Sequence, residues 1–348
     1  MSSTMQVVQF REHGGPEVLE LVERPIPEPA PGEVLVRVLA VSVNHLDLWV
    51  RRGLPGIPVE LPFVPGSDAA GEIAALGEGV SDLEVGQRVL VLPGVSSGTS
   101  EFDERGDDHL SDDYRLRGEH FDGVDREYVS VEARFVLPLP DGLDPEVAAA
   151  VPVTWITAWG MLVERARLAA GETVLVIAGS SGVGTAGIQI ARDLGARVIT
   201  TAGSEAKRAF ALEQGAHEVL DHHDPEWPRQ VKGLTGGRGV EVVFEHVGPA
   251  TWGGALRSLA RRGRLVTCGG TTGPKVEVLL PHLFMKNLSL LGSTMGPRRA
   301  FPGILERVAS GAFRPPIQEI LPLSAIREAH RRLEAGEVLG KLVLRPGT

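Results

Sequence analysis

A glycine-rich turn between a strand pattern and a helix pattern carries the clearest chemistry in this chain. The apolar run 173–177 leads into Gly179-Ser180-Ser181-Gly182-Val183-Gly184, and a helix pattern follows over 185–194. Glycines let the backbone approach a pyrophosphate closely, and a helix N-terminus offers free N–H groups with a partial positive charge. Ser181 stands where the second glycine of GxGxxG would fall, so a plain tight turn is the alternative. The strand before it and the helix after it favour a dinucleotide site.

The residues after the next strand pattern select the cofactor. An NAD site places Asp or Glu about 20 residues past the glycines, where it holds the ribose 2′-hydroxyl. Here Ala202 and Gly203 occupy that region, followed by Ser204, Lys207 and Arg208. A hydroxyl and two cations can meet a 2′-phosphate, so NADP(H) is favoured over NAD(H). Alternatively, Ser204 only caps a helix and the basic pair is a solvated face.

The elements around this turn alternate between strand and helix patterns, which predicts an α/β fold with a parallel, doubly wound sheet. Strands are expected at 173–177, 197–201, 240–244, 264–267 and 289–292, and helices at 185–194 and 205–214.

The first 140 residues differ, because short strand patterns such as 34–41 and 87–92 are cut by Gly and Pro. They predict an antiparallel, barrel-like section. Asp144-Pro145-Glu146 is a helix start signal. The segment 96–113 is rich in Ser, Gly and Asp, so we expect a surface lobe or mobile loop with little to order it. An amphipathic helix over 324–334 and a short strand over 341–344 are expected near the end.

Composition limits the classes of protein that the chain can represent. Its 348 residues fit one large or two ordinary domains, and 43% apolar with 23% charged residues is a globular profile. A net charge of −10 argues against nucleic-acid binding, and the single Cys268 excludes intrachain disulfides and cysteine-rich zinc modules. Residues 1–6 lack a secretory signal pattern, and the uncharged stretches 147–163 and 173–191 are interrupted by turn residues. We therefore expect a cytoplasmic protein without a membrane span.

With these pieces placed, the chain resembles the medium-chain dehydrogenase/reductase superfamily over essentially its full length. The matching stretches, besides the nucleotide turn, are 65–73, 85–89, 123–129, 154–159, 239–245 and Gly340-Lys341. The resemblance implies a GroES-like, mainly β catalytic domain over 1–150, to which 293–348 returns, and a Rossmann domain over 151–292. It also implies nicotinamide-dependent hydride transfer in the cleft between them, and a homodimer or homotetramer. Besides the residues above, the cofactor contacts that it implies are Thr157, Val247, Cys268, Gly269 and Lys341.

The resemblance places the zinc ligands of the alcohol dehydrogenase branch on residues that are poor ligands. A catalytic zinc ion needs three protein ligands, commonly two Cys and one His, with an open position. The corresponding positions are Asn44, Ser67 and Val153 or Thr154. A structural zinc with spacing C-x₂-C-x₂-C-x₇-C would fall on the set Ser97, Ser100, Asp103 and Ser111. We therefore expect neither zinc ion, although the second match is open to coincidence in a Ser/Asp-rich segment.

Candidate catalytic residues cluster in two short segments that the resemblance assigns to the cleft. The stretch 43–53 matches the Asn-x-x-Asp segment of quinone reductases, with Trp49 where many relatives have Tyr. Four of these candidates have a structural alternative. His45 and His120 are either proton donors or substrate contacts, or they are structural histidines bonded to backbone. Asp47 and Asp68 either line the substrate site or tie the barrel loops together by hydrogen bonds. The full set of candidates is Asn44, His45, Asp47, Trp49, Ser67, Asp68 and His120.

Without a metal, conjugate reduction is the more feasible chemistry. Alcohol oxidation relies on a Lewis acid to stabilise the alkoxide, whereas reduction of an enone or quinone spreads charge over an enolate that neutral donors can hold. We therefore expect an NADPH-dependent reductase of quinones or α,β-unsaturated carbonyls, with the Asn44 amide and a backbone N–H holding the oxyanion. Two alternatives stay open: an alcohol or aldehyde dehydrogenase with an unrecognised metal site involving His45, Asp68 or His120, and a non-catalytic NADP(H)-binding sensor or structural protein.

Overall fold

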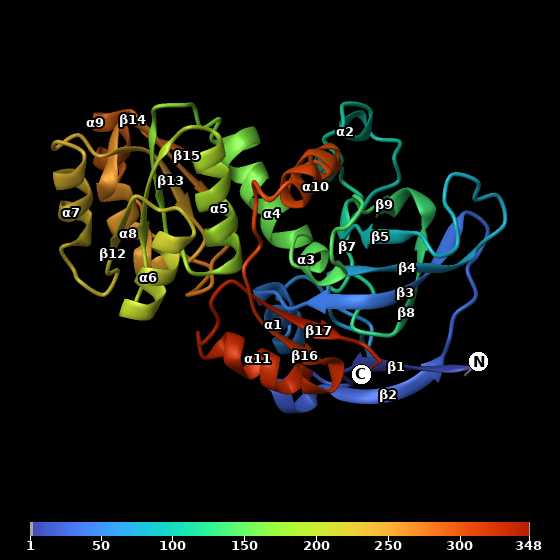
Figure 1. The fold of residues 1–348 in the computed structure, drawn as a ribbon. Helices are drawn as coiled ribbons and strands as arrows, with labels where there is room; N and C mark the ends of the chain where they lie inside the picture. The colour runs from blue at the N-terminus through green and yellow to red at the C-terminus, as the bar shows by residue number, and fades with distance from the viewer. Residues whose placement is uncertain (1–2, 348) are drawn as a thin grey trace. The chain divides into compact units, whose positions relative to one another are not determined.

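The computed structural model describes residues 3–347 and divides into two compact units (Figure 1). Unit 1 comprises 1–153 and 297–348, and unit 2 comprises 154–296. Met1, Ser2 and Thr348 lie outside the described residues, and so does the start of the segment that we assessed for a signal. In the described part of the chain, no helix is both long and apolar enough to cross a membrane.

Unit 2 is built on a six-stranded parallel sheet, as the alternation of patterns predicts. Its order is β12-β11-β10-β13-β14-β15. The chain order along the sheet reverses between β10 and β13, and dinucleotides bind at the carboxyl ends of the strands at such a switch point. The strands are β10 (Thr173–Val176), β11 (Arg197–Thr201), β12 (Glu218–Leu220), β13 (Val240–Glu245), β14 (Leu259–Thr267) and β15 (Ser289–Gly292).

Helices cover both faces of this sheet. Phe244 of β13 lies under α5, where a Cβ on Gly187 would be 3.2 Å from the Phe244 ring. Its neighbour Val243 points to the opposite face, because side chains alternate along a strand, and packs there with residues of α7 and α8. The helices of unit 2 are α5 (Gly182–Asp193), α6 (Glu205–Glu213), α7 (Trp227–Leu234), α8 (Pro249–Ser258) and α9 (Leu280–Lys286), with α4 (Pro152–Trp159) continuing into a π-helical turn over Gly160–Arg165.

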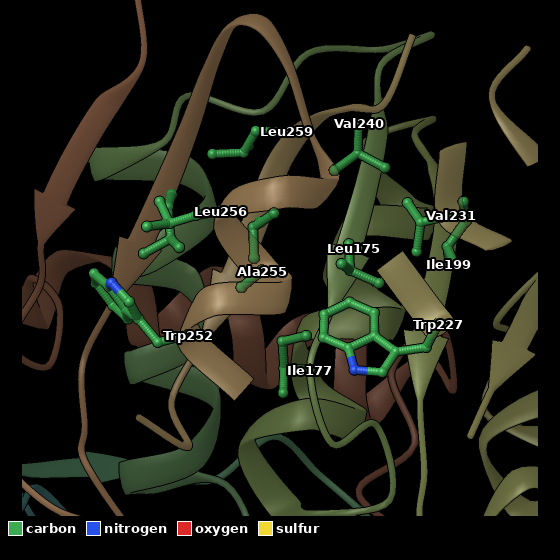
Figure 2. Packing of buried hydrophobic residues seen from close by; sticks show 12 residues of the cluster. Leu175, Ile177, Ile199, Trp227, Val231, Val240, Trp252, Ala255, Leu256 and Leu259 are labelled. Carbon is green, nitrogen blue, oxygen red and sulfur yellow. The ribbon is translucent and has the colours of Figure 1, made fainter. Parts of the chain in front are cut away.

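The core between the sheet and the α7–α8 pair contains two tryptophans (Figure 2). Trp227 begins α7, and Trp252 lies in the first half of α8. Gly254 lets the two helices approach, because a Cβ on it would overlap the Trp227 ring. This close approach explains a glycine inside α8, where glycine otherwise lowers helix stability.

Unit 1 contains a seven-stranded, largely antiparallel sheet with the order β16-β17-β3-β4-β5-β9, in which β8 also pairs with β3. Only β16 and β17 run parallel. The strands are β3 (Glu33–Ser42), β4 (Asp68–Leu76), β5 (Arg88–Val91), β8 (Tyr128–Glu132), β9 (Val136–Pro138), β16 (Ile317–Pro322) and β17 (Lys341–Arg345), with separate pairs β1 (Thr4–Gln9) with β2 (Glu20–Pro25) and β6 (Gly94–Val95) with β7 (Arg115–Leu116). The helices are α1 (His45–Arg52), α2 (Glu101–Glu104), α3 (Pro145–Ala149), α10 (Phe301–Ala309) and α11 (Ile326–Glu334).

Strand β17 brings the far end of the chain to the start of α1. Val343 and Leu344 pair with Ser42 and Val41 of β3, whose last residues lead into α1. The antiparallel section, the strands at 34–41 and 87–92 and the C-terminal helix and strand are thus confirmed. The helix signal at Asp144 gives only α3, five residues long.

Hydrogen bonds among its own side chains hold the segment 96–113, which we expected to be a surface lobe or mobile loop. Asp103 accepts hydrogen bonds from the hydroxyls of Ser96 and Ser100, both 2.6 Å long, and Asp113 accepts one from Ser111, also 2.6 Å long. Ser100 also caps the short helix α2. Charge-assisted bonds between short polar side chains therefore order this lobe without an apolar core.

Substitution of Gly254 tests the packing in Figure 2. We expect Gly254→Ala to lower the free energy of unfolding by about 1–3 kcal/mol, because its methyl group overlaps the Trp227 ring. Gly233→Ala in α7 is the control, since a Cβ there meets nothing within 4 Å and alanine favours helix. Urea unfolding of both variants checks this; equal stabilities would contradict the packing.

Candidate functional site

Three buried polar side chains from distant parts of the chain meet where β3, α1, β4 and β17 come together in unit 1. Asn44 precedes α1, Asp68 begins β4, and Lys341 begins β17. The Lys341 ammonium donates to Asn44 Oδ1 at 2.6 Å and to Asp68 Oδ2 at 3.2 Å. The Asn44 amide in turn donates to Asp68 Oδ2 at 2.8 Å. We call these three residues the Lys341 cluster.

Asp68 ties this cluster to its surroundings. Its Oδ1 accepts from the backbone N–H of Val153 at 2.9 Å, and its Oδ2 also accepts from the Ser42 hydroxyl at 3.0 Å. The side chains of Asp68 and Lys341 are 0% and 4% exposed. A buried charge pair is stable only when its remaining donors and acceptors are satisfied. Asp68 therefore acts as a tie between loops, the alternative left open for it above.

Lys341 was predicted to contact the cofactor, and its contacts argue against that role. Its third hydrogen bond goes to the Val43 carbonyl at 3.0 Å, so all three ammonium hydrogens have partners inside unit 1. An ammonium group has only three donors. A cofactor contact would require one of these bonds to break.

The Asn44 amide was predicted to hold an enolate oxygen, a role that stays a prediction because its N–H groups have other partners in the structure. Its N–H groups point to Asp68 Oδ2 and, at 3.5 Å, to the Ser42 carbonyl, and the residue is buried. An oxyanion donor must be free to point at the substrate. Asn44 directly precedes α1, whose N-terminus carries a partial positive charge.

Asp47 holds the start of α1 in place. Its Oδ2 accepts from the backbone N–H of Asn44 at 2.7 Å, the reverse half of a capping box. Oδ1 is buried with no hydrogen-bond partner among the described residues. Burial, with the nearby carboxylate of Asp125 as the second cause, raises the pKa of Asp47 well above its ordinary value. Asp47 is therefore a positioning residue for Asn44.

His45 and Trp49 share the partly exposed side of α1. They lie four residues apart, one helical turn, and both are half-buried, whereas Asp47 and Leu48 lie on the buried side. These two predicted residues are thus brought together on one surface of α1, which offers an imidazole and an indole N–H but no phenol.

Ser67 and His120 meet the same loop of unit 1. The Ser67 hydroxyl donates to the Arg117 carbonyl at 2.8 Å, and His120 Nδ1 accepts from the backbone N–H of Leu116 at 3.1 Å. Burial, followed by the charge of Arg115, lowers the pKa of His120. His120 is therefore bonded to backbone, as its structural alternative proposed.

Glu119 is a candidate acid that the sequence reasoning missed. Its side chain is only 12% exposed, and burial raises its pKa to about 7. Its Oε2 lies 3.4 Å from His120 Nδ1. A carboxyl that titrates near neutrality is a typical candidate for acid–base chemistry, but its burial leaves no signal in the sequence.

The residues at the implied catalytic zinc positions do not fit a zinc ion. The Asn44 oxygen accepts from the Lys341 ammonium, the Ser67 hydroxyl donates to a carbonyl, and Val153 offers no side-chain donor. Zinc is bound by thiolate, imidazole or carboxylate groups. Across residues 3–347, no group of three or more His, Cys, Asp or Glu side chains is arranged to hold a metal.

In unit 2, the nucleotide turn has the geometry that a dinucleotide needs. Ser181 is the N-cap of α5, and its hydroxyl accepts from the backbone N–H of Gly184 at 3.0 Å. A Cβ on Gly179 would overlap Thr200, and one on Gly184 would overlap the Ala178 carbonyl. A larger residue at either glycine would push the turn apart. The turn thus fits a pyrophosphate, with α5 beginning three residues earlier than predicted.

The predicted 2′-phosphate residues lie together at the start of α6. Ser204 is the N-cap and accepts from the Lys207 backbone N–H at 3.3 Å, so its capping role is observed. Arg208 forms an ion pair with Asp221 at 2.9 Å, both side chains being about one-third exposed. Arg208 of the basic pair is thus already paired with a carboxylate, and a bound 2′-phosphate would compete with Asp221 for its guanidinium group.

Two histidines after β12, His222 and His223, lie against Gly203 beside the start of α6. A Cβ on Gly203 would lie 2.7 Å from His222 Nε2 and 2.6 Å from His223 Nε2. Their rings are 4.6 Å apart in an edge-to-face arrangement. Burial, then the charge of His223, lowers the pKa of His222.

The other residues predicted to contact the cofactor lie just after strands of the six-stranded sheet, except Thr157, which lies in α4. The backbone N–H of Ala202 donates to Leu220, Val247 is bonded to Glu245 and Thr272, and Thr157 donates to the sulfur of Met295. Cys268 and Gly269 follow β14, and burial raises the pKa of the Cys268 thiol to about 12. These positions are compatible with cofactor binding and stay predictions.

Comparisons with known proteins give a consistent picture. Two family models match, one described as "Alcohol dehydrogenase GroES-like domain" over residues 30–141 and one described as "Zinc-binding dehydrogenase" over residues 182–310. A quinone oxidoreductase from Rattus norvegicus is 33% identical over 98% of this chain and 97% of its own length. One from Pseudomonas aeruginosa is 34% identical over 97% of this chain and 99% of its own. The crystal structure of an NAD-dependent alcohol dehydrogenase superimposes with a TM-score of 0.94, at 43% identity over 99% of this chain and all of that one.

Removing the Lys341 ammonium tests the cluster. We expect Lys341→Met to lower the free energy of unfolding by about 3–5 kcal/mol, because the buried Asp68 carboxylate loses its cation. Adding Asp68→Asn should recover part of the loss. Arg345→Ala is the control: its ion pair with Glu146 is partly exposed and contributes under about 1 kcal/mol. Equal losses for the lysine and arginine variants would contradict the cluster's importance.

The pH dependence of stability tests Glu119. Because its pKa is raised to about 7 in the folded protein, its contribution is complete below about pH 4.5 and is lost as the pH rises through 7. We expect Glu119→Gln to be more stable than the wild type at pH 8 by about 2–3 kcal/mol, and the difference to shrink toward pH 4.5. Urea unfolding across this range measures it, with the exposed Glu78→Gln as control. A pH-independent difference would rule out the raised pKa.

Proposed function

Because the chain belongs to the medium-chain dehydrogenase/reductase superfamily and is an oxidoreductase of the quinone oxidoreductase-like type, we propose that it is an NADPH-dependent reductase of quinones or α,β-unsaturated carbonyls that works without zinc. The observation that carries the proposal is the Lys341 cluster. The Lys341 ammonium occupies the Asn44 oxygen, and the other two implied zinc positions, Ser67 and Val153 or Thr154, supply no thiolate or imidazole.

Unit 2 supplies the cofactor site in this proposal. The pyrophosphate lies on the turn 179–184 at the start of α5, and the 2′-phosphate meets Ser204, Lys207 and Arg208. When bound, the reduced nicotinamide supplies a hydride to an electron-poor carbon. The absence of a carboxylate at Ala202 and Gly203 supports NADP(H). The alcohol dehydrogenase matched above is NAD-dependent by its title, so NAD(H) is the competing cofactor.

Unit 1 supplies the substrate site. The substrate lies near Asn44, Trp49 and Ser67, with Asp47 and Asp68 holding the backbone around it. The negative charge that develops on the substrate oxygen is stabilised through space by the positive end of α1, and the nearby Lys341 adds positive charge. His45, on the partly exposed side of α1, or solvent supplies the proton.

A homodimer formed through unit 2 completes the proposal. Strand β15 is an edge of the six-stranded sheet, and the adjacent α9 exposes a group of large apolar side chains. Exposed apolar clusters of this kind are typical of protein contacts, and edge strands pair readily with a second copy. The group is Leu279, Leu280, Phe284 and Met285.

The decisive experiment combines turnover with metal analysis. Purified protein is assayed with NADPH and NADH against a panel of quinones and enones, and against alcohols with NADP⁺ and NAD⁺, with and without a chelator. NADPH-dependent reduction, with no stoichiometric zinc and no effect of the chelator, supports the proposal. Alcohol oxidation that the chelator abolishes would instead support the metal-dependent dehydrogenase. Tight NADPH binding without any turnover would support a sensor.

Substitution of Lys207 tests the choice of cofactor. We expect Lys207→Ala to weaken NADPH binding roughly tenfold, because a charge-assisted contact to the 2′-phosphate is lost, and to leave NADH binding almost unchanged. Titration of the protein fluorescence measures both affinities, with the exposed Lys275→Ala as control. A parallel loss for both cofactors would count against a 2′-phosphate contact.

A further inference from the structure

His246 is an unusual side chain at the point where the sheet of unit 2 reverses its order. It directly follows β13, whose neighbour on one side is β10. Its Nε2 lies 2.8 Å from the carbonyl oxygen of Ile177, which directly follows β10. The imidazole therefore bridges the ends of the two strands that flank the switch point. Its partner Ile177 lies one residue before Ala178, where the chain turns into the nucleotide turn.

The surroundings hold this ring in one orientation. The Phe244 ring meets it edge-on, with centroids 5.8 Å apart and an interplanar angle of 72°. The carboxylate of Glu245, the residue before His246, accepts hydrogen bonds from the backbone N–H groups of Val247 and Gly248 and from the Thr251 hydroxyl. The Thr271 hydroxyl lies 3.3 Å from the His246 carbonyl. Backbone and side chain are thus both fixed before any ligand arrives.

The bond to Ile177 also decides which ring nitrogen carries the proton. A carbonyl oxygen only accepts, so Nε2 must donate. Burial lowers the pKa of His246 to about 4, so the ring is neutral near pH 7. Nδ1 is then an acceptor, and the structure gives it no hydrogen-bond partner within residues 3–347. An acceptor nitrogen repels a phosphate oxygen and attracts an O–H or N–H group.

The sheet order indicates which part of a dinucleotide would meet this acceptor. The predicted 2′-phosphate residues follow β11, on one side of β10, and the nucleotide turn follows β10 itself. A dinucleotide that crosses the switch point continues to the other side, over the ends of β13 and β14. That side carries His246, so the nicotinamide half is the half within reach.

We propose that His246 Nδ1 accepts a hydrogen bond from the nicotinamide half of the cofactor, from a hydroxyl of its ribose. This rests on the proposed function only in requiring that a nicotinamide dinucleotide binds. His246 is then a binding residue that fixes the position of the nicotinamide ribose, and it takes no part in proton transfer, because its only proton is held by Ile177.

The variant His246→Gln separates the two ring nitrogens. A glutamine amide can still donate to the Ile177 carbonyl, but it has no acceptor at the position of Nδ1. We expect NADPH and NADP⁺ to bind roughly 3–10-fold more weakly, the size of one neutral hydrogen bond. The fragment 2′,5′-ADP, which lacks the nicotinamide half, should bind as in the wild type. The exposed His282→Gln is the matched control and should change neither affinity.

Calorimetric titration of the wild type and both variants with the three ligands measures these affinities. A dinucleotide with an acetyl group in place of the carboxamide distinguishes the donors: a penalty that persists supports the ribose hydroxyl, and one that disappears overturns that assignment in favour of the amide. Equal NADPH affinities in wild type and His246→Gln would overturn the proposal, as would an equal loss for 2′,5′-ADP. If the wild type binds no dinucleotide at all, the proposed function fails instead.

A second measurement keeps the test open if His246→Gln does not fold. In wild-type protein with ¹⁵N-labelled histidine, the imidazole signals should show the Nε2–H tautomer near pH 7. Adding NADP⁺ should shift the Nδ1 resonance of His246 in the direction of hydrogen bonding. An Nδ1–H tautomer, or an Nδ1 signal that saturating NADP⁺ leaves unchanged, would overturn the proposal.

Discussion

One ammonium group near the end of the chain organises the candidate active site in unit 1. Lys341 holds Asn44 and Asp68, and Asp68 holds Ser42 and the backbone of Val153. Because all of these groups are buried, each depends on the others for its hydrogen bonds, and removing the cation leaves a carboxylate unpaired in a region of low dielectric. The return of β17 to the sheet is therefore a requirement of the site as well as of the fold.

The same cluster relates the site to metal-dependent enzymes of similar architecture. A zinc ion would bring positive charge and an open coordination position; Lys341 brings positive charge with every donor already used. Such a site can influence charge on a substrate through space, but it offers no coordination bond. The reduction proposed above suits such a site, because its charge spreads over an enolate and needs no coordination bond.

Hydrogen bonds between short polar side chains hold the lobe 96–113. Ser100, Asp103 and Ser111, at positions that match a four-cysteine site, take part in hydroxyl-to-carboxylate hydrogen bonds with their neighbours. We expected a surface lobe or mobile loop because the segment has no apolar core. Short polar side chains that satisfy one another can fix a surface loop without one, which composition alone does not reveal.

The sequence by itself determined the parallel sheet, the nucleotide turn and the family, because strand periodicity, glycine spacing and helix caps are local properties of the chain. It also placed Asn44, Asp68 and Lys341 among the residues of interest. Only the tertiary structure decided what they do: the Asn44 amide donates to Asp68, and the Lys341 ammonium donates to groups of unit 1. Burial raises the pKa of Glu119, and the hydrogen bond to the Ile177 carbonyl sets the tautomer of His246. Such properties depend on groups hundreds of residues apart or on exclusion from water, and neither is written in local spacing.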